Sequence, residues 1–127
     1  MAEVVLDASA VLARVLGEPG GERVEAVLAG ACMCAVNYGE VVGKLVDFGV
    51  PVETAGAAAR ELRLEVVPFD EADATDAGLL RATTRGFGLS LGDRACLALG
   101  KRLELPVLTT DRAWAQLDLG VEVVLIR

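Results

Sequence analysis

Short apolar segments that alternate with helical patterns restrict the fold of this chain more than any other feature of its sequence. The apolar segments have the length of buried strands and lie at residues 4–6, 31–36, 64–67, 106–108 and 121–126. Helical spacing is found at residues 11–16, 22–29, 37–48, 52–62, 70–85 and 90–103, and a short last helix follows residue 111. Strands that alternate with helices need crossover connections, so they form a parallel sheet covered on both faces. No repeat or polar linker interrupts the 127 residues, and we expect one α/β domain over residues 1–127.

Two aspartates follow strands of this expected sheet. Asp7 comes directly after the first strand, and Asp111 follows the strand at 106–108 behind Thr109 and Thr110. In parallel sheets, ligands bind beyond the carboxyl ends of the strands. We therefore expect Asp7 and Asp111 to project at the same edge of the sheet.

The chain contains no histidine, and this limits the chemistry that it can perform. Ser-His and Cys-His nucleophile systems and histidine acid/base pairs are excluded. The three cysteines, Cys32, Cys34 and Cys96, do not form a zinc-binding pattern and are interpreted as small buried residues. Hydrolysis would have to use carboxylates and a metal ion. The net charge of −7 argues against a general nucleic-acid coat protein, but a nuclease remains compatible with it because metal-binding carboxylates contribute to that charge.

Four acidic residues of the sequence each have a purely structural explanation. Asp7 and Asp111 stand at helix N-cap positions, and Ser90 and Asp93 have the spacing of a capping box. Glu40 belongs to a polar helix face. That face, in the helix at 37–48, consists of Asn37, Glu40, Lys44 and Asp47.

The same four acids, taken together, indicate a metal site. Three of them stand at helix starts and one on a helix body, so all four could meet at one opening, where their mutual repulsion would require a cation. Magnesium prefers oxygen ligands, retains several waters and is commonly held by a few carboxylates. Gly39 and Gly92 stand beside two of the acids, and glycine at these positions permits close approach of the backbone.

The order and surroundings of the four acids resemble the PIN-domain family, and most closely its VapC ribonuclease toxins from prokaryotic toxin–antitoxin pairs. The resemblance spans nearly the whole chain. Its motifs are Asp7-Ala8-Ser9-Ala10, Asn37-Tyr38-Gly39-Glu40-Val41-Val42, Leu89-Ser90-Leu91-Gly92-Asp93-Arg94-Ala95 and Leu108-Thr109-Thr110-Asp111-Arg112.

The resemblance implies a three-layer α/β/α fold with a central parallel sheet in the order 3-2-1-4-5. It also implies Mg²⁺, with Mn²⁺ as a substitute, cleavage of single-stranded or loop RNA, a cognate antitoxin and a homodimer. Matched residue by residue, the catalytic and metal-binding acids are Asp7, Glu40, Asp93 and Asp111, and the polar supports are Ser9 and Thr109.

Two other functions compete with a nuclease. Haloacid-dehalogenase-like phosphatases and receiver domains also carry a carboxylate after their first strand, but the phosphatases need a second aspartate where this chain has Ser9. A catalytically silent α/β binding module, with every acid serving as a cap, is the second alternative. The sequence predicts neither a signal peptide nor a membrane span, so we expect a cytoplasmic protein without membrane contact.

Overall fold

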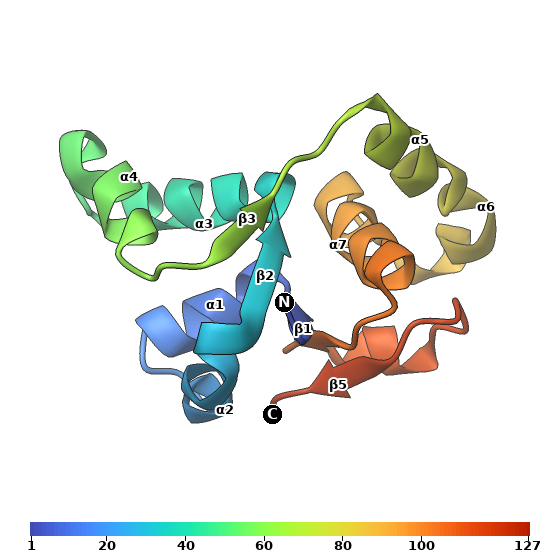
Figure 1. Cartoon of the computed structure of the whole chain (residues 1–127), viewed down its shortest axis with the longest axis horizontal. Helices are drawn as coiled ribbons and strands as arrows, with labels where there is room; N and C mark the ends of the chain where they lie inside the picture. Colours follow the sequence, from blue (N-terminus) through green and yellow to red (C-terminus); the bar gives the residue numbers. More distant parts are fainter.

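The computed structural model describes residues 1–127 and contains one five-stranded parallel sheet. Its strands are β1 (Val4–Leu6), β2 (Ala31–Cys34), β3 (Glu65–Val67), β4 (Val107–Thr109) and β5 (Val123–Leu125). They lie in the order β3-β2-β1-β4-β5, with β1 in the centre. This arrangement confirms the expected α/β class and strand order, and Figure 1 shows the strands passing between the helices.

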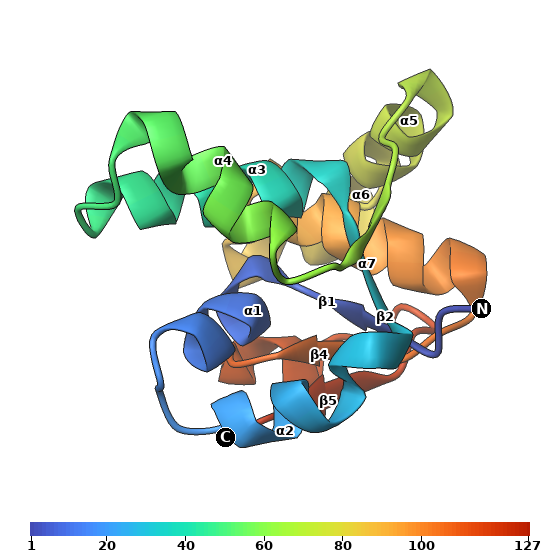
Figure 2. The ribbon, with the colours of Figure 1, turned by 60° about the vertical axis from the view of Figure 1, so that its left-hand side comes forward.

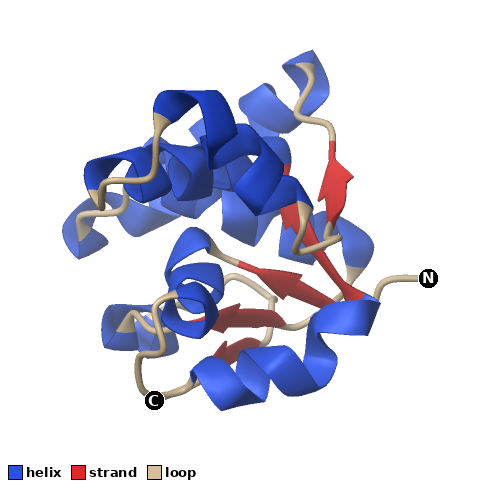
Figure 3. Ribbon diagram, turned by 90° about the vertical axis from the view of Figure 1, so that its left-hand side faces the viewer, coloured by secondary structure: helices blue, strands red, loops and turns tan.

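Helices cover both faces of the sheet. They are α1 (Ala8–Val15), α2 (Gly21–Val27), α3 (Ala35–Asp47), α4 (Val52–Arg60), α5 (Glu71–Leu79), α6 (Arg81–Thr84) and α7 (Leu91–Leu103), with 3₁₀ turns η1 (Leu28–Gly30), η2 (Arg85–Phe87) and η3 (Arg112–Gln116). Figures 1 and 2 both place α1 and α2 at one side of the molecule and α5 and α6 at the opposite side, and Figure 3 shows the strands enclosed by helices. None of the helices has the length and apolar character that crossing a membrane requires.

Alternating side chains of the strands build two separate cores. Leu6 of β1 packs with α1, α3 and α4, whereas its neighbour Val5 packs with α5, α7 and η3. Met33 and Cys32 of β2 divide in the same way. Successive side chains of a strand point to opposite faces, so the two apolar clusters make the three-layer α/β/α architecture.

The region expected to form one helix over residues 70–85 is instead broken. A capping box between Asp70 and Asp73 begins α5 as the sequence indicates, but the helix ends at Leu79 and a short α6 follows. The hydroxyls of Thr83 and Thr84 both donate to the carbonyl of Leu80, at 3.3 and 2.8 Å. Hydroxyl bonds of this kind compete with the helical ladder and bend helices.

Other boundaries differ from expectation by a few residues, and one of these differences matters for the site. Helix α3 begins at Ala35 rather than at Asn37, and its N-cap residue, Cys34, makes no side-chain capping bond. Asn37 is therefore the third residue of the helix and is 2% exposed, although the polar pattern had assigned it to a solvated face. The last helix is a 3₁₀ turn, and β5 is shorter than the apolar segment at 121–126.

Candidate functional site

One cavity of about 230 Å³ brings together all four acidic residues singled out in the sequence. It opens beside the carboxyl ends of β1 and β4. Its lining consists of Asp7, Ala8, Ser9, Leu12, Asn37, Glu40, Lys44, Asp93 and Asp111. The acids come from the first strand's end, from α3, from the start of α7 and from the residue after β4, so residues far apart in sequence meet here.

Asp7 is the buried centre of this cavity, with only 5% of its surface exposed. Strands β1 and β4 are paired in parallel, which sets Asp7 beside Thr109. The Thr109 hydroxyl donates to Asp7 Oδ2 at 2.6 Å, and the other oxygen, Oδ1, accepts from Ser9 Oγ at 2.7 Å and from the Ala10 amide at 2.8 Å. The Ala10 bond caps α1. Both carboxylate oxygens are thus fixed by short hydrogen bonds.

Ser9 and Thr109 connect this carboxylate to the segment that carries Asp111. The Asp111 amide donates to Thr109 Oγ1 at 3.0 Å, and the Thr110 amide donates to Ser9 Oγ at 3.0 Å. Each hydroxyl therefore donates a hydrogen bond to Asp7 and accepts one from a backbone amide of the segment that follows β4. This geometry places the two residues where supports for a metal-binding carboxylate would stand.

Burial changes the ionisation of Asp7. Desolvation raises its pKa from 3.8 to about 6, against the hydrogen bonds from Thr109, Ala10 and Ser9, which lower it, while the charge of Asp93 adds a smaller increase. The cavity is therefore an environment in which negative charge is insufficiently compensated by the protein itself. A bound cation would supply the missing compensation.

Asp111 is the N-cap residue of η3 and Asp93 is the third-residue acid of the α7 capping box, and each keeps one oxygen available for a ligand. Asp93 Oδ2 accepts from the Ser90 amide at 3.0 Å, which completes the capping box expected from the sequence, and Asp111 Oδ1 accepts from the Ala113 amide at 3.0 Å. Asp93 Oδ1 and Asp111 Oδ2 accept no hydrogen bond within the chain. Capping and metal binding are consequently compatible in the same side chains.

Glu40 reaches the cavity from α3 with help from its neighbour Asn37. The Asn37 side-chain amide donates to Glu40 Oε1 at 2.8 Å and to the Gly92 carbonyl at 2.9 Å. Lys44, one turn further along α3, adds a cation to the cavity lining and forms no ion pair. Helical spacing placed Asn37 and Lys44 on a solvated stripe, because spacing does not reveal which part of a polar face is buried. The family motif that begins at Asn37 gave that residue no role.

The donor set suits a hard divalent cation, but the side chains do not form a closed coordination sphere. All the cavity's candidate ligands are carboxylate or amide oxygens, the type that Mg²⁺ and Mn²⁺ prefer. No three acidic or thiol side chains are close enough together to hold one ion. Mg²⁺ retains several waters and commonly uses only one or two protein carboxylates directly, so the open arrangement fits this cation.

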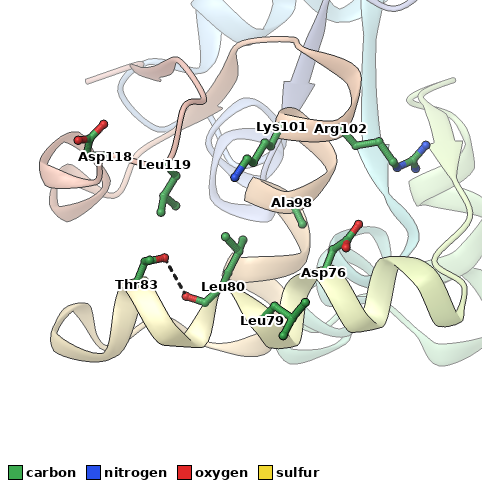
Figure 4. Close-up of a pocket in the computed structure, with 9 residues that line it drawn as sticks. All are labelled: Asp76, Leu79, Leu80, Thr83, Ala98, Lys101, Arg102, Asp118 and Leu119. Atoms are coloured by element: carbon green, nitrogen blue, oxygen red, sulfur yellow. Dashed lines mark hydrogen bonds between the residues drawn. The ribbon is translucent and has the colours of Figure 1, made fainter.

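A larger cavity of about 570 Å³ lies elsewhere, between the α5–α6 region, α7 and the segment before β5. Figure 4 shows Leu80 and Leu119 pointing toward one another across it, while Asp76 and Asp118 lie at different ends. None of the four candidate acids lines it. The acids converge only in the smaller cavity, so we assign the functional site there.

The cysteines do not contribute a nucleophile. Cys32, Cys34 and Cys96 are free and buried, as expected from the sequence. Burial raises the pKa of the Cys32 thiol to about 11 and raises the pKa of Cys34 and Cys96 as well. The reactive thiolate form is therefore disfavoured at all three positions.

Comparison with known families identifies the family of the chain. The family model of the PIN domain matches residues 4–119. The chain belongs to the PIN-domain family. No curated protein sequence matches it. The family assignment agrees with the nuclease indicated by the acidic motifs, and it covers every acid of the cavity.

Solved structures share the fold of this PIN domain over nearly the whole chain. A DNA-bound VapBC complex of Salmonella typhimurium has a chain that is 19% identical with a TM-score of 0.77, and the alignment covers 100% of both chains. A chain of a toxin–antitoxin complex of Klebsiella pneumoniae is 17% identical with a TM-score of 0.72, and the alignment covers 98% of each chain. VapC20 of Mycobacterium tuberculosis is described as a sarcin–ricin loop cleaving toxin. It is 14% identical with a TM-score of 0.72, and the alignment covers 94% of this chain and 99% of VapC20. At these identities, the likeness establishes the fold.

Proposed function

We propose that residues 1–127 form one cytoplasmic PIN domain that acts as a metal-dependent endoribonuclease and as the toxin of a VapBC-type toxin–antitoxin pair. The observation that carries this proposal is the convergence of four carboxylates on one cavity around a buried aspartate. Such a cavity suits Mg²⁺, with Mn²⁺ as a substitute. In a chain without histidine, a metal ion held by carboxylates can supply the activation of water that histidine provides in other hydrolases.

The side chains divide into ligands and supports. Asp7 and Asp93 are the principal metal ligands in this proposal, and Asp111 and Glu40 bind directly or through water. Ser9 and Thr109 hold Asp7 in one orientation through the short hydrogen bonds described above. When bound, the metal would acidify a water for attack on phosphorus and neutralise the charge that develops on the phosphate.

Lys44 provides a contact for the substrate. It is the cationic side chain in the lining of the carboxylate cavity, and no acid of the chain pairs with it. A phosphodiester that approaches four carboxylates is repelled until a cation offsets their charge. Lys44 can receive a phosphate oxygen of the RNA backbone next to the metal and thereby offset part of this repulsion.

The partners follow from the site and from the structural neighbours. Several neighbours are toxin–antitoxin complexes, which supports an antitoxin as partner. A carboxylate cluster without metal is a favourable site for an arginine, so we expect the antitoxin to place a basic side chain among the acids. The proposal further includes a homodimer, as the family resemblance implies.

The decisive experiment maps the cleavage of total RNA by sequencing, with Mg²⁺ and with excess EDTA. Asp7→Asn is the inactive variant, and Asp118→Asn is its matched control because Asp118 is an exposed aspartate outside the cavity. We expect discrete cleavage sites that require metal, that persist in the control and that disappear with Asp7→Asn. Undiminished cleavage in EDTA would contradict the metal-dependent mechanism.

A further inference from the structure

Glu40 is the one carboxylate of the site that comes from the body of a helix rather than from a helix start, and two neighbours hold it. Asn37 lies three residues earlier on α3, and Gly92 lies on α7. These residues form what we call the α3–α7 clasp, consisting of Asn37, Glu40 and Gly92. The clasp joins helices whose contacting residues are 55 positions apart in sequence.

The orientation of the Asn37 amide is determined by its partners. Nδ2 faces two acceptors, Glu40 Oε1 at 2.8 Å and the Gly92 carbonyl at 2.9 Å, and it uses one proton for each. The reversed amide would set an oxygen against both acceptors and is therefore excluded. Oδ1 in the observed orientation is buried without any hydrogen-bond partner.

An unpartnered buried amide oxygen costs folding free energy. Asn37, which is only 2% exposed, nevertheless occupies this position. An apolar residue would fill the space without the unpaired oxygen. The contribution of Asn37 therefore comes from its NH₂ group, which donates one hydrogen bond to Glu40 and one to the Gly92 carbonyl.

Gly92 contributes to the α3–α7 clasp because its missing side chain leaves space for the Glu40 carboxylate. A Cβ atom added to Gly92 would lie 2.7 Å from Glu40 Oε1 and 2.8 Å from Oε2, closer than such atoms approach in proteins. The carboxylate of Glu40 therefore occupies the space that any other residue at position 92 would fill. Gly39, which is adjacent to Glu40 in sequence, has nothing within 4 Å of an added Cβ.

From this geometry we propose that Asn37 and Gly92 are positioning residues that hold the Glu40 carboxylate at the metal cavity. The inference rests on the proposed function for its catalytic consequence. Asn37 restrains one oxygen of Glu40 by a hydrogen bond, and Gly92 admits the whole carboxylate against the start of α7. Side chains that orient a metal ligand commonly change metal affinity or activity about 10- to 100-fold when they are removed.

The first test follows the Glu40 side chain itself, without metal or substrate. NMR three-bond couplings should report a single Glu40 rotamer in the parent and averaged rotamers in Asn37→Ala and in Gly92→Ala. Gly92→Ala should fold, because alanine favours helix and the atoms in conflict belong to the end of a flexible side chain. Gly39→Ala adds the same methyl group in open space and should leave the couplings unchanged. A single unchanged rotamer in both clasp variants would overturn the proposal.

The second test separates positioning from a structural bond between helices. Calorimetry with Mn²⁺ and kcat for RNA cleavage are measured for Asn37→Ala, Glu40→Ala and the double variant. If Asn37 acts through Glu40, each single variant should lose about 10- to 100-fold in Mn²⁺ affinity and in kcat, and the double variant should lose no more than Glu40→Ala. Losses that multiply would show that Asn37 acts independently of Glu40 and would overturn the inference.

Two further outcomes keep the conclusions separate. Asn37→Ser retains a hydrogen-bond donor and should recover part of the Mn²⁺ affinity, and it also replaces Asn37→Ala if that variant does not fold. If the parent binds no Mn²⁺ and cleaves no RNA, the proposed function fails. The NMR couplings then still decide whether Asn37 and Gly92 hold Glu40.

Discussion

Replacing Asp7 by asparagine should stabilise the metal-free protein at neutral pH while abolishing its activity. Asp7 is 5% exposed, and burial raises its pKa from 3.8 to about 6. Near pH 7 without metal, the folded state therefore contains a desolvated anion. Asparagine is close in shape and neutral, and its oxygen can accept the bonds from Ser9 and Ala10 that Asp7 Oδ1 accepts now.

The sign and magnitude follow from proton linkage. A folded-state pKa above the unfolded value means that the folded protein binds the proton more tightly, so this group favours folding at low pH. That contribution is complete below pH 3.8 and is lost as the pH rises through about 6. At about 1.4 kcal/mol per pKa unit, the loss reaches at most about 3 kcal/mol. The asparagine variant does not experience it.

The assay is urea unfolding in EDTA from about pH 4 to about pH 7, with the parent, Asp7→Asn and the exposed control Asp118→Asn. The free energy of unfolding of Asp7→Asn relative to the parent should rise with pH by up to about 3 kcal/mol, whereas the control should follow the parent. Parallel curves for parent and Asp7→Asn would refute the argument from burial. Mg²⁺ at about one hundred times its Kd should add about 2.7 kcal/mol to the parent and clearly less to the variant.

Three other measurements test the proposed site. In EDTA, Asp93→Asn and Asp111→Asn should each unfold within about 0.5 kcal/mol of the parent, because an asparagine side-chain oxygen can accept the same backbone N–H bond that each aspartate accepts now. Each variant should gain less stability from Mg²⁺ than the parent. Equal gains would show that both residues serve only the helix starts. Lys44→Gln should raise KM for RNA with little change in kcat. It should also lower the magnitude of the slope of log affinity against log salt concentration by about 0.7, the value for one phosphate contact on a single strand. An unchanged slope would show that Lys44 does not contact the substrate. Mn²⁺ affinity measured by calorimetry should fall as the pH drops below about 6, since a proton and the cation compete for Asp7; an affinity independent of pH between about 5 and 7 would show that Asp7 is not a ligand.

The order of elements could be predicted because local signals agree with the packing. The segment at residues 4–6 is apolar and is followed at once by a capping aspartate, and the structure contains β1 and α1 with Asp7 as N-cap. Ser90 and Asp93 likewise marked the start of α7. The break after Leu79 was missed because apolar spacing continues through it. Only the geometry shows the threonine hydroxyls bonding back to the carbonyl of Leu80.

Asn37 shows why the site could be predicted only in part. The motifs selected four acids because a carboxylate can be recognised from its residue type, and three of the four also stand after a strand or at a helix start, whereas Glu40 lies in the body of α3. The role proposed for Asn37 depends instead on a contact between helices: the packing of α3 against α7 brings the Gly92 carbonyl within 2.9 Å of the Asn37 side-chain amide. Helical spacing assigned Asn37 and Glu40 to the same solvated stripe, yet one is buried and the other exposed. A polar residue one turn before an acid is therefore ambiguous in sequence, and burial against a second helix is what makes it a candidate for positioning that acid.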